Sequence, residues 1–119
     1  MMIYVAGKFS AETRADVEAN IRAAVSVGLE VARVGAFPVI PHANTAHPEF
    51  EYLQPYRFWI DGTRILCRAC DALITVPGWE SSSGAKFEVS DMYDRGKPVF
   101  HSIEELDAWL SGRAGRRWP

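Results

Sequence analysis

The sequence has few cysteines, no excess of charge of either sign and no long apolar run. Two cysteines are too few for a disulfide scaffold. The 13 Lys and Arg nearly balance the 15 Asp and Glu, so we expect neither a nucleic acid polymer nor an anionic membrane as the main partner. No apolar run approaches the roughly 20 residues of a membrane span, and the first residues lack the pattern of a signal peptide. These absences favour a cytoplasmic protein.

The two cysteines, Cys67 and Cys70, have a spacing that occurs in redox and metal sites. They fall where a helix is predicted to end, whereas a redox pair usually follows a strand and opens a helix. No second pair and no close His cluster completes a zinc site. Packing thiols are the favoured interpretation, with a redox or metal role as the alternative. We predict no metal and no cofactor.

What is present is the composition of a globular domain. Hydrophobic residues make up 48% of the 119 residues and charged residues 24%, which is close to the average of folded proteins. This length is sufficient for one buried core. We predict a single domain over residues 1–119, with a frayed tail at 112–119.

Strand-like and helix-like segments alternate along the chain. Apolar runs predict strands at 3–6, 36–40, 71–76 and 98–101. Helical spacing and capping residues predict a first helix that Ser10 caps and Gly35 ends. Later helices are predicted at about 55–69, from 81–84 to 95, and from the cap Ser102 to 110, and residues 41–54 are expected to be irregular.

This alternation predicts a Rossmann-like α/β three-layer sandwich with a small parallel sheet of four to five strands. The strands are apolar on both faces, as strands covered by helices on both sides must be. In such a sheet, ligands bind beyond the carboxyl ends of the strands. We therefore expect the loops at 7–10, 41–45 and 77–84 to converge on one site.

The third loop carries the strongest functional pattern. Ser81, Ser82, Ser83 and Gly84 open a helix, whose free backbone N–H groups and hydroxyls can bind a phosphate. The alternative is that the serines only cap the helix. Glu88 follows about one turn later, where the helix dipole favours an ionised carboxylate and thus a nucleophile. Its alternative is a solvated surface residue.

The other two loops supply candidate binding groups. Gly7 lets the backbone approach a ligand, and Lys8 can neutralise a phosphate. Tyr4, in the first strand, is either a core aromatic or a group that reaches the site. The remaining candidates are His42 and Asn44, which can bind a sugar or base unless they only stabilise a turn, and Phe9 and Trp79, which can stack on a base unless they only cover the core.

With these residues in place, the sequence resembles the nucleoside 2-deoxyribosyltransferase-like superfamily. It looks closest to the small single-domain members, near the 2′-deoxynucleoside 5′-phosphate N-hydrolases. The resemblance covers nearly the whole chain and is strongest in residues 77–88, the Pro-Gly-Trp-Glu-Ser-Ser-Ser-Gly-Ala-Lys-Phe-Glu segment. Residues 3–7 and 70–74 match the family's first and third strands.

The resemblance implies roles for individual residues. Glu88 takes the place of the nucleophile, which attacks C1′ of a 2-deoxyribosyl group to form a covalent intermediate. Tyr4 matches the tyrosine that orients this glutamate, and Ser82 and Gly84 match positions that bind the 5′-phosphate. Because members that use free nucleosides have an acid at the place of Ser82, a nucleoside monophosphate is the favoured substrate.

One position departs from the family pattern. Many members have an aspartate, the acid for the leaving base, eight residues before the aspartate of the third strand. Thr63 stands there in this chain, and the nearest acid is Asp61. Positions two apart on a helix point to different faces, so Asp61 can substitute only if the helix starts late or is distorted.

Three functions are therefore compared. The favoured one is cleavage of the N-glycosidic bond of 2′-deoxynucleotides, by hydrolysis or by transfer to a second base. The second is a non-catalytic protein that binds a nucleotide or a nucleotide signal. The third is a phosphoribohydrolase acting on ribonucleotides, whose Pro-Gly-Gly loop resembles residues 77–88 except that Trp79 replaces a glycine.

We also predict a homodimer or a larger homo-oligomer. The chain has four Trp, six Phe and four Tyr, more aromatic surface than a small core needs to bury. One helix cannot turn every apolar side chain of the segment 50–59 toward a single core: Phe50, Tyr52, Leu53, Tyr56, Phe58 and Trp59. The alternative is a loop that hides these rings within one chain. The family resemblance implies a shared active site as well.

Overall fold

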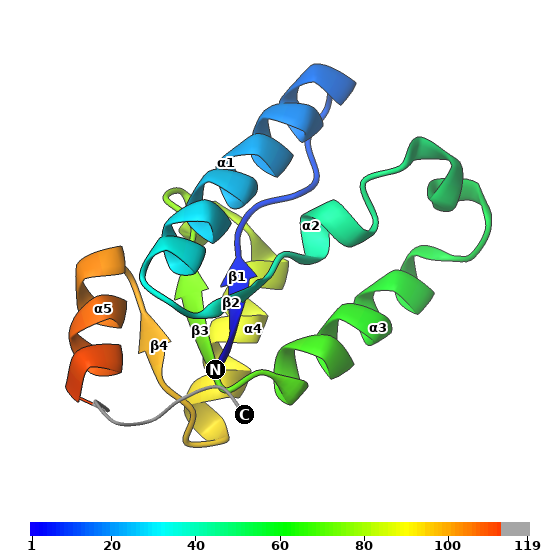
Figure 1. The fold of residues 1–119 in the computed structure, drawn as a ribbon. Coiled ribbons are helices and arrows are strands. Elements are labelled where there is room, and N and C mark those ends of the chain that lie inside the picture. Colours follow the sequence, from blue (N-terminus) through cyan, green and yellow to red (C-terminus); the bar gives the residue numbers. More distant parts are fainter. Residues whose placement is uncertain (113–119) are drawn as a thin grey trace.

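The computed structural model describes residues 1–112, which form a four-stranded parallel sheet covered by helices on both faces (Figure 1). The strands are β1 Met2–Ala6, β2 Phe37–Val39, β3 Ala72–Thr75 and β4 Val99–Phe100, in the spatial order β2-β1-β3-β4. The expected Rossmann-like α/β sandwich is confirmed, with four strands in the part of the chain that is described.

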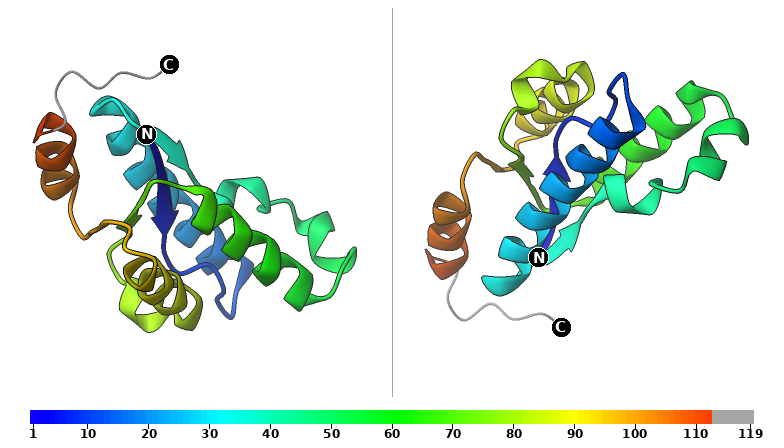
Figure 2. Two further views of the ribbon diagram at one scale, coloured as in Figure 1. Left: turned by 90° about the horizontal axis from the view of Figure 1, so that it is seen from below. Right: turned by 90° about the horizontal axis from the view of Figure 1, so that it is seen from above.

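The main helices form two outer layers. Helices α1 Arg14–Arg33 and α5 Ile103–Gly112 cover one face of the sheet, and α3 Tyr56–Ala69 and α4 Ser83–Asp94 cover the other (Figure 2). The short elements are α2 Pro41–Asn44 and the 3-10 turns η1 Pro48–Tyr52 and η2 Trp79–Ser81. No helix within residues 1–112 has both the length and the apolarity needed to cross a membrane.

Alternate residues of β1 enter two separate cores. Ile3 and Val5 pack with α1 and α5, whereas Tyr4 and Ala6 pack with α3 and α4. This double burial is why the strands are apolar at nearly every position. Cys67 and Cys70 are free thiols in the second core, and burial raises the pKa of Cys70 to about 11. They are packing thiols, as the sequence favoured.

The first helix starts later than expected. Thr13, rather than Ser10, is its N-cap, and its side chain accepts a hydrogen bond of 3.1 Å from the backbone N–H of Asp16. Residues 7–13 remain a loop, which the Asn20 amide holds by donating to the Phe9 carbonyl at 3.0 Å. Ser10 therefore lies in the loop and not at the start of the helix, so the prediction that Ser10 caps the helix was wrong.

The segment 41–54 is more ordered than predicted. Pro41 and Pro48 stand in the first turns of α2 and η1, where a missing N–H and a fixed φ favour helical turns. At the other end, α5 continues past the predicted end at residue 110 to Gly112. The rest of the predicted frayed tail, 113–119 with Trp118, lies outside the described residues.

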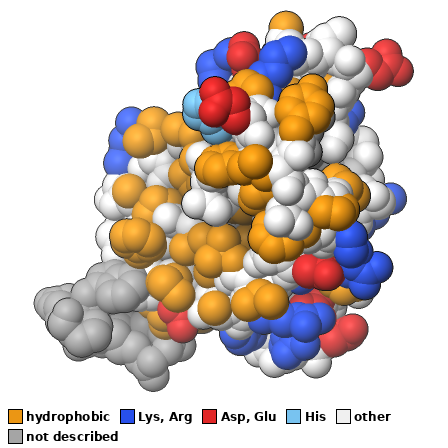
Figure 3. Space-filling model, turned by 90° about the vertical axis from the view of Figure 1, so that its right-hand side faces the viewer, with side chains coloured by type: hydrophobic (Ala, Val, Ile, Leu, Met, Phe, Trp, Pro, Cys, Tyr) orange, Lys and Arg blue, Asp and Glu red, His pale blue; other side chains and the backbone are white. Residues whose placement is uncertain are grey.

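Elements α2, η1 and the first half of α3 extend away from the sheet as an arm (Figures 1 and 2). Several large apolar side chains of the arm are exposed, among them Tyr52 at 86% and Leu53 at 65%. Figure 3 faces this side of the molecule and shows apolar side chains gathered across it. The idea that a loop hides these rings within one chain is therefore wrong.

Candidate active site

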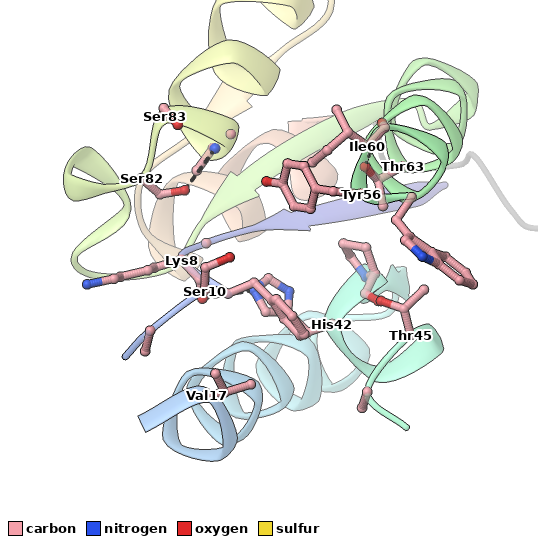
Figure 4. Close-up of a pocket in the computed structure, with 18 of the residues that line it drawn as sticks. Lys8, Ser10, Val17, His42, Thr45, Tyr56, Ile60, Thr63, Ser82 and Ser83 are labelled. Atoms are coloured by element: carbon pink, nitrogen blue, oxygen red, sulfur yellow. Dashed lines mark hydrogen bonds between the residues drawn. The ribbon is translucent and has the colours of Figure 1, made fainter. Parts of the chain in front are cut away.

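A cavity of about 660 Å³ lies beyond the carboxyl ends of β1 and β2, beside the start of α4 (Figure 4). Its volume is typical of sites for small organic ligands. All three loops that the sequence singled out contribute to it. Its walls include Tyr4, Gly7, Lys8, Phe9, Ser10, His42, Ser81, Ser82, Ser83, Gly84 and Glu88. We refer to it as the main cavity.

Tyr4 and Glu88 meet in the wall of the main cavity. The Tyr4 ring is buried in the second core, and its hydroxyl donates a hydrogen bond to Oε2 of Glu88. Burial, reinforced by the charge of Glu88, raises the pKa of Tyr4 far above its usual range, so the phenol keeps its proton. Tyr4 is thus a core aromatic whose polar end reaches the site.

Glu88 titrates in the neutral range. Burial raises its pKa to about 7, although the hydrogen bond from Tyr4 and the charge of Arg64 oppose this shift. Burial thus outweighs the influences that favour the charged form, so the expectation that the helix dipole keeps Glu88 ionised does not hold. A partly buried carboxylate with this pKa can act as a nucleophile or as a general base once it is deprotonated.

The start of α4 forms a polar end of the cavity. Ser82 is the N-cap, and its hydroxyl accepts a hydrogen bond of 3.2 Å from the backbone N–H of Ala85. It therefore caps the helix and lines the cavity at the same time. Ser83 and Gly84 also line this wall, and Figure 4 shows the Lys8 side chain on the same side as Ser82. This end suits an anion.

Gly7 has a packing reason as well as a place in the cavity wall. A Cβ on Gly7 would lie 2.7 Å from the Cβ of Val76, which is too close for any side chain. The absence of a side chain therefore lets the chain leaving β1 pass directly against the end of β3. That contact directs Lys8 and the rest of the loop over the cavity.

His42 contacts the loop that follows β1, at Lys8 and Phe9. The residue is only 4% exposed, and Nε2 of its ring lies 3.0 Å from the carbonyl oxygen of Lys8. Burial lowers the pKa of His42, which keeps the ring neutral. The Phe9 ring packs against it in a tilted arrangement with 5.6 Å between centroids. Both side chains line the main cavity, and their role in ligand binding stays a prediction.

Three predicted site residues lie outside the main cavity. Asn44 is exposed at the end of α2. Trp79 stacks on His101, with 5.4 Å between ring centroids and 17° between planes, and lines a separate hollow beside β3 and β4. Asp61 is exposed and pairs with Arg57 at 3.1 Å. None of these three residues lines the main cavity, where the sequence had predicted them.

The orientation of residues around α3 explains why Asp61 does not face the main cavity. The helix is regular from Tyr56 to Ala69, so positions 61 and 63 point to different sides. Thr63 lines the main cavity, and its hydroxyl donates to the Ile60 carbonyl at 2.9 Å. The position at which the family has its acid therefore faces the site, but it holds a threonine.

The aromatic side of the cavity was not predicted from the sequence. Phe50, Tyr56 and Trp59 line it, together with Ile60 and Val17. The signal was present in the aromatic-rich segment 50–59, which was assigned only to a partner surface. The segment in fact divides, because Phe50, Tyr56 and Trp59 reach the cavity and Tyr52, Leu53 and Phe58 are left on the arm.

A protein-family model described as a domain of unknown function, DUF1937, matches residues 1–104. The chain belongs to the DUF1937 family. The matched range holds both Tyr4 and Glu88 and every wall of the main cavity, so the cavity is part of the family domain. Among curated proteins, none matches the chain. Within residues 1–112, no cluster of three or more His, Cys, Asp or Glu side chains is arranged to hold a metal ion.

Proposed function

We propose that this DUF1937 protein cleaves the N-glycosidic bond of 2′-deoxynucleoside 5′-monophosphates. The observation that carries the proposal is the Tyr4–Glu88 pair, a partly buried carboxylate held by a phenol in the wall of a cavity of ligand size. It is the pair that the resemblance to the nucleoside 2-deoxyribosyltransferase-like superfamily implies. We expect the reaction in the cytoplasm.

The two ends of the cavity support a nucleotide as the ligand. Ser82, Ser83 and Lys8 form an end suited to a phosphate, and Tyr56, Ile60 and Thr63 lie at the opposite end in Figure 4. A base placed among Phe9, Tyr56 and the other rings is stabilised by stacking and burial. The sugar of such a ligand then lies between these ends, within reach of Glu88.

The proposed reaction proceeds by double displacement at C1′ of the sugar. The Glu88 carboxylate attacks C1′, the C1′–N bond breaks, and the base leaves with the bonding electron pair. Water then attacks C1′ of the glycosyl-enzyme, the bond between C1′ and Glu88 breaks, and Glu88 leaves as a carboxylate. The proton that the water loses balances the one that the departed base takes up from solvent. In a transfer reaction, a second base attacks C1′ in place of water. Tyr4 fixes one carboxylate oxygen by its hydrogen bond and leaves the other for the attack.

The leaving base receives no proton from α3. Thr63 faces the cavity without an acidic group, and Asp61 is paired with Arg57 outside it. General acid assistance contributes typically about 10²–10⁴-fold to such reactions, so we expect slow turnover on bases that are poor leaving groups. The same observation favours a second candidate, a nucleotide-binding protein without catalysis. The phosphoribohydrolase remains the third.

One incubation separates the three candidates. The protein is mixed with a panel of ribo- and deoxyribonucleosides and their 5′-monophosphates, and the released base is measured by chromatography. Release from deoxynucleotides supports the proposal, and release from ribonucleotides supports the phosphoribohydrolase. Saturable binding of nucleotides without any release identifies the binding protein.

Ser82→Asp tests the phosphate end of the cavity. Aspartate keeps the N-cap function, so the helix should be preserved while a negative charge is placed beside the phosphate. We expect affinity for a 5′-monophosphate to fall roughly tenfold more than affinity for the matching nucleoside, as measured by calorimetry. Ser90→Asp, on the exposed side of the same helix, is the control. Equal losses for both ligands would show that the phosphate binds elsewhere.

We further propose that the exposed face of the arm pairs with a second copy of the chain. Light scattering should then give about twice the 13.3 kDa mass of one chain at micromolar concentration. Leu53→Lys should shift the mass toward one chain, because Leu53 is exposed on the arm. Leu29→Lys, at an exposed leucine of α1, should not. A mass of one chain that persists as concentration rises contradicts the dimer.

A further inference from the structure

Arg64 places a positive charge at the junction of α3 and α4. The central carbon of its guanidinium lies 3.8 Å from the centroid of the Phe87 ring, which is a cation–π contact. Arg64 is half-buried, and Phe87 directly precedes Glu88 in α4. Within residues 1–112, Arg64 takes part in no ion pair. Its charge is therefore held on a ring beside Glu88 and is not neutralised by a carboxylate.

Arg64 lies on the side of α3 that is turned toward the second core. Ile60 lines the main cavity, and Cys67 packs with Tyr4 in that core. Arg64 comes about one turn after Ile60 and about one turn before Cys67, so the three residues lie along one side of the helix. The contact with Phe87 of α4 is made from this same side.

Tyr4 of β1 and two residues of α3, Cys67 and Arg64, interact with Glu88. Burial raises the pKa of both Tyr4 and Cys67 far above their usual ranges, so both groups are neutral. A guanidinium keeps its charge in proteins. Burial raises the pKa of Glu88, whereas the hydrogen bond from Tyr4 and the charge of Arg64 lower it. Arg64 is thus the charged neighbour that favours the carboxylate.

The other charged groups around Glu88 are paired or face solvent. On α4, Asp91 pairs with Arg68 at 2.9 Å and with Arg95 at 3.2 Å, and the remaining charged residues of this helix are exposed. Of the other elements packed against α4, β3 and β4 have no ionisable side chain, and Glu80 of η2 is exposed. None of these groups can take the place of Arg64.

We propose that Arg64 is a positioning residue for Glu88: its guanidinium, held over the Phe87 ring, keeps Glu88 as a carboxylate whose second oxygen is free to attack. An arginine paired directly with Glu88 could bind both carboxylate oxygens in its fork. On Phe87 it supplies its charge without an ion pair, so Tyr4 binds Oε2 and Oε1 is left for the reaction. The inference rests on the proposed function for the role of Glu88 as nucleophile, and it names a further residue on which that role depends.

The test follows the titration of the Glu88 carboxyl group in the free protein by NMR, with carboxyl-labelled glutamate. The Glu88 signal is identified by its loss in Glu88→Gln. Arg64→Gln removes the charge, and Arg64→Lys keeps it. The matched control is Arg57→Gln, which removes an exposed charge from the same helix. The titration needs neither a ligand nor turnover.

We expect Arg64→Gln to raise the midpoint of the Glu88 titration from about 7 by roughly 0.5–1 pH unit, because the carboxylate loses a nearby positive charge. Arg64→Lys should show less than half of this shift, and Arg57→Gln should show none. The acidic limb of kcat/KM should move with the midpoint. Turnover of Arg64→Gln at pH 7 should therefore fall about two- to fivefold and recover at higher pH.

Three results overturn the inference: no shift in Arg64→Gln, an equal shift in Arg57→Gln, or a shift in Arg64→Lys as large as that in Arg64→Gln. If Arg64→Gln does not fold, Arg64→Met decides the matter with the same titration, because it keeps an unbranched side chain over the Phe87 ring.

Phe87→Leu tests the ring as the anchor of the charge. Without the ring, the guanidinium is free to move into solvent, so the midpoint should rise toward that of Arg64→Gln. An unchanged or lowered midpoint would show that Phe87 does not hold the charge in place.

The outcome is separable from that of the proposed function. Base release by the wild type with no shift of the Glu88 midpoint in Arg64→Gln overturns only the role of Arg64. A shifted midpoint without base release from any nucleotide supports the effect of Arg64 on Glu88 and overturns the proposed chemistry. A shifted midpoint with an unmoved kcat/KM limb removes Glu88 from the nucleophile's role.

Discussion

Glu88→Gln should lower release of the base from 2′-deoxynucleotides by about a thousandfold or more, because the amide has the shape of the carboxylate but cannot attack C1′. The amide oxygen can still accept the hydrogen bond from Tyr4, so the local structure should be kept. Turnover is measured by chromatography of the free base. A 2-fluoro-deoxyribosyl substrate should label Glu88, and a label on Asp61 or Asp71 would contradict its role.

The stability of Glu88→Gln shows whether a loss of turnover comes from the chemistry or from unfolding. The pKa of Glu88 is raised from 4.5 to about 7 in the folded protein, so the folded state binds this proton more tightly than the unfolded state does. The contribution of Glu88 to stability is therefore lost as the pH rises through this range in the wild type, and this contribution is absent from Glu88→Gln. We expect the melting temperature of Glu88→Gln at about pH 8 to equal or exceed that of the wild type. Glu80→Gln, at an exposed glutamate, should change neither turnover nor stability. Retention of more than a few per cent of turnover would remove Glu88 from the nucleophile's role.

Tyr4→Phe should shift the acidic limb of the pH–rate profile upward by roughly 1–2 pH units. The hydrogen bond from Tyr4 stabilises the charged form of Glu88, and a bond to a charged group contributes about 1.5–3 kcal/mol. Without it, a larger fraction of Glu88 is protonated at neutral pH. Turnover at pH 7 should fall about tenfold or more and recover in part at higher pH.

The measurement is the pH dependence of kcat/KM for the wild type and the variant. Activity in the wild type should rise through the Glu88 pKa of about 7, since the nucleophile is the deprotonated form. Tyr93→Phe, at an exposed tyrosine of the same helix α4, is the matched control and should leave the limb in place. A limb that does not move in Tyr4→Phe would show that Tyr4 only packs in the core.

Much of the fold follows from local signals. The strands were found because they are apolar on both faces, which only burial between two helical layers explains. Gly35 was correctly placed at the end of α1, where its φ of +91° is one that residues with a side chain rarely adopt. The convergence of three loops at one edge followed from parallel topology, and Ser82 and Glu88 were placed correctly because they belong to one short segment.

Tertiary structure decided what depends on the phase of a helix or on distant neighbours. Whether Asp61 or Thr63 faces the cavity depends on where α3 begins, a boundary that a sequence locates only to within a few residues. Trp79 and Asn44 belong to the expected loops, yet packing turned Trp79 onto His101 and left Asn44 in solvent. The order of residues in a loop does not determine which side chains point into the cavity.

The chemistry of the site divides in the same way. The sequence determined which groups are present at the edge of the sheet: a tyrosine, a glutamate, a row of serines and a lysine. Only the folded chain decided their states. Burial among residues far apart in the sequence brings the pKa of Glu88 close to neutrality, joins it to Tyr4 across 84 positions and lowers the pKa of His42. Desolvation depends on which atoms surround a group in space, and the order of residues along the chain does not specify those neighbours.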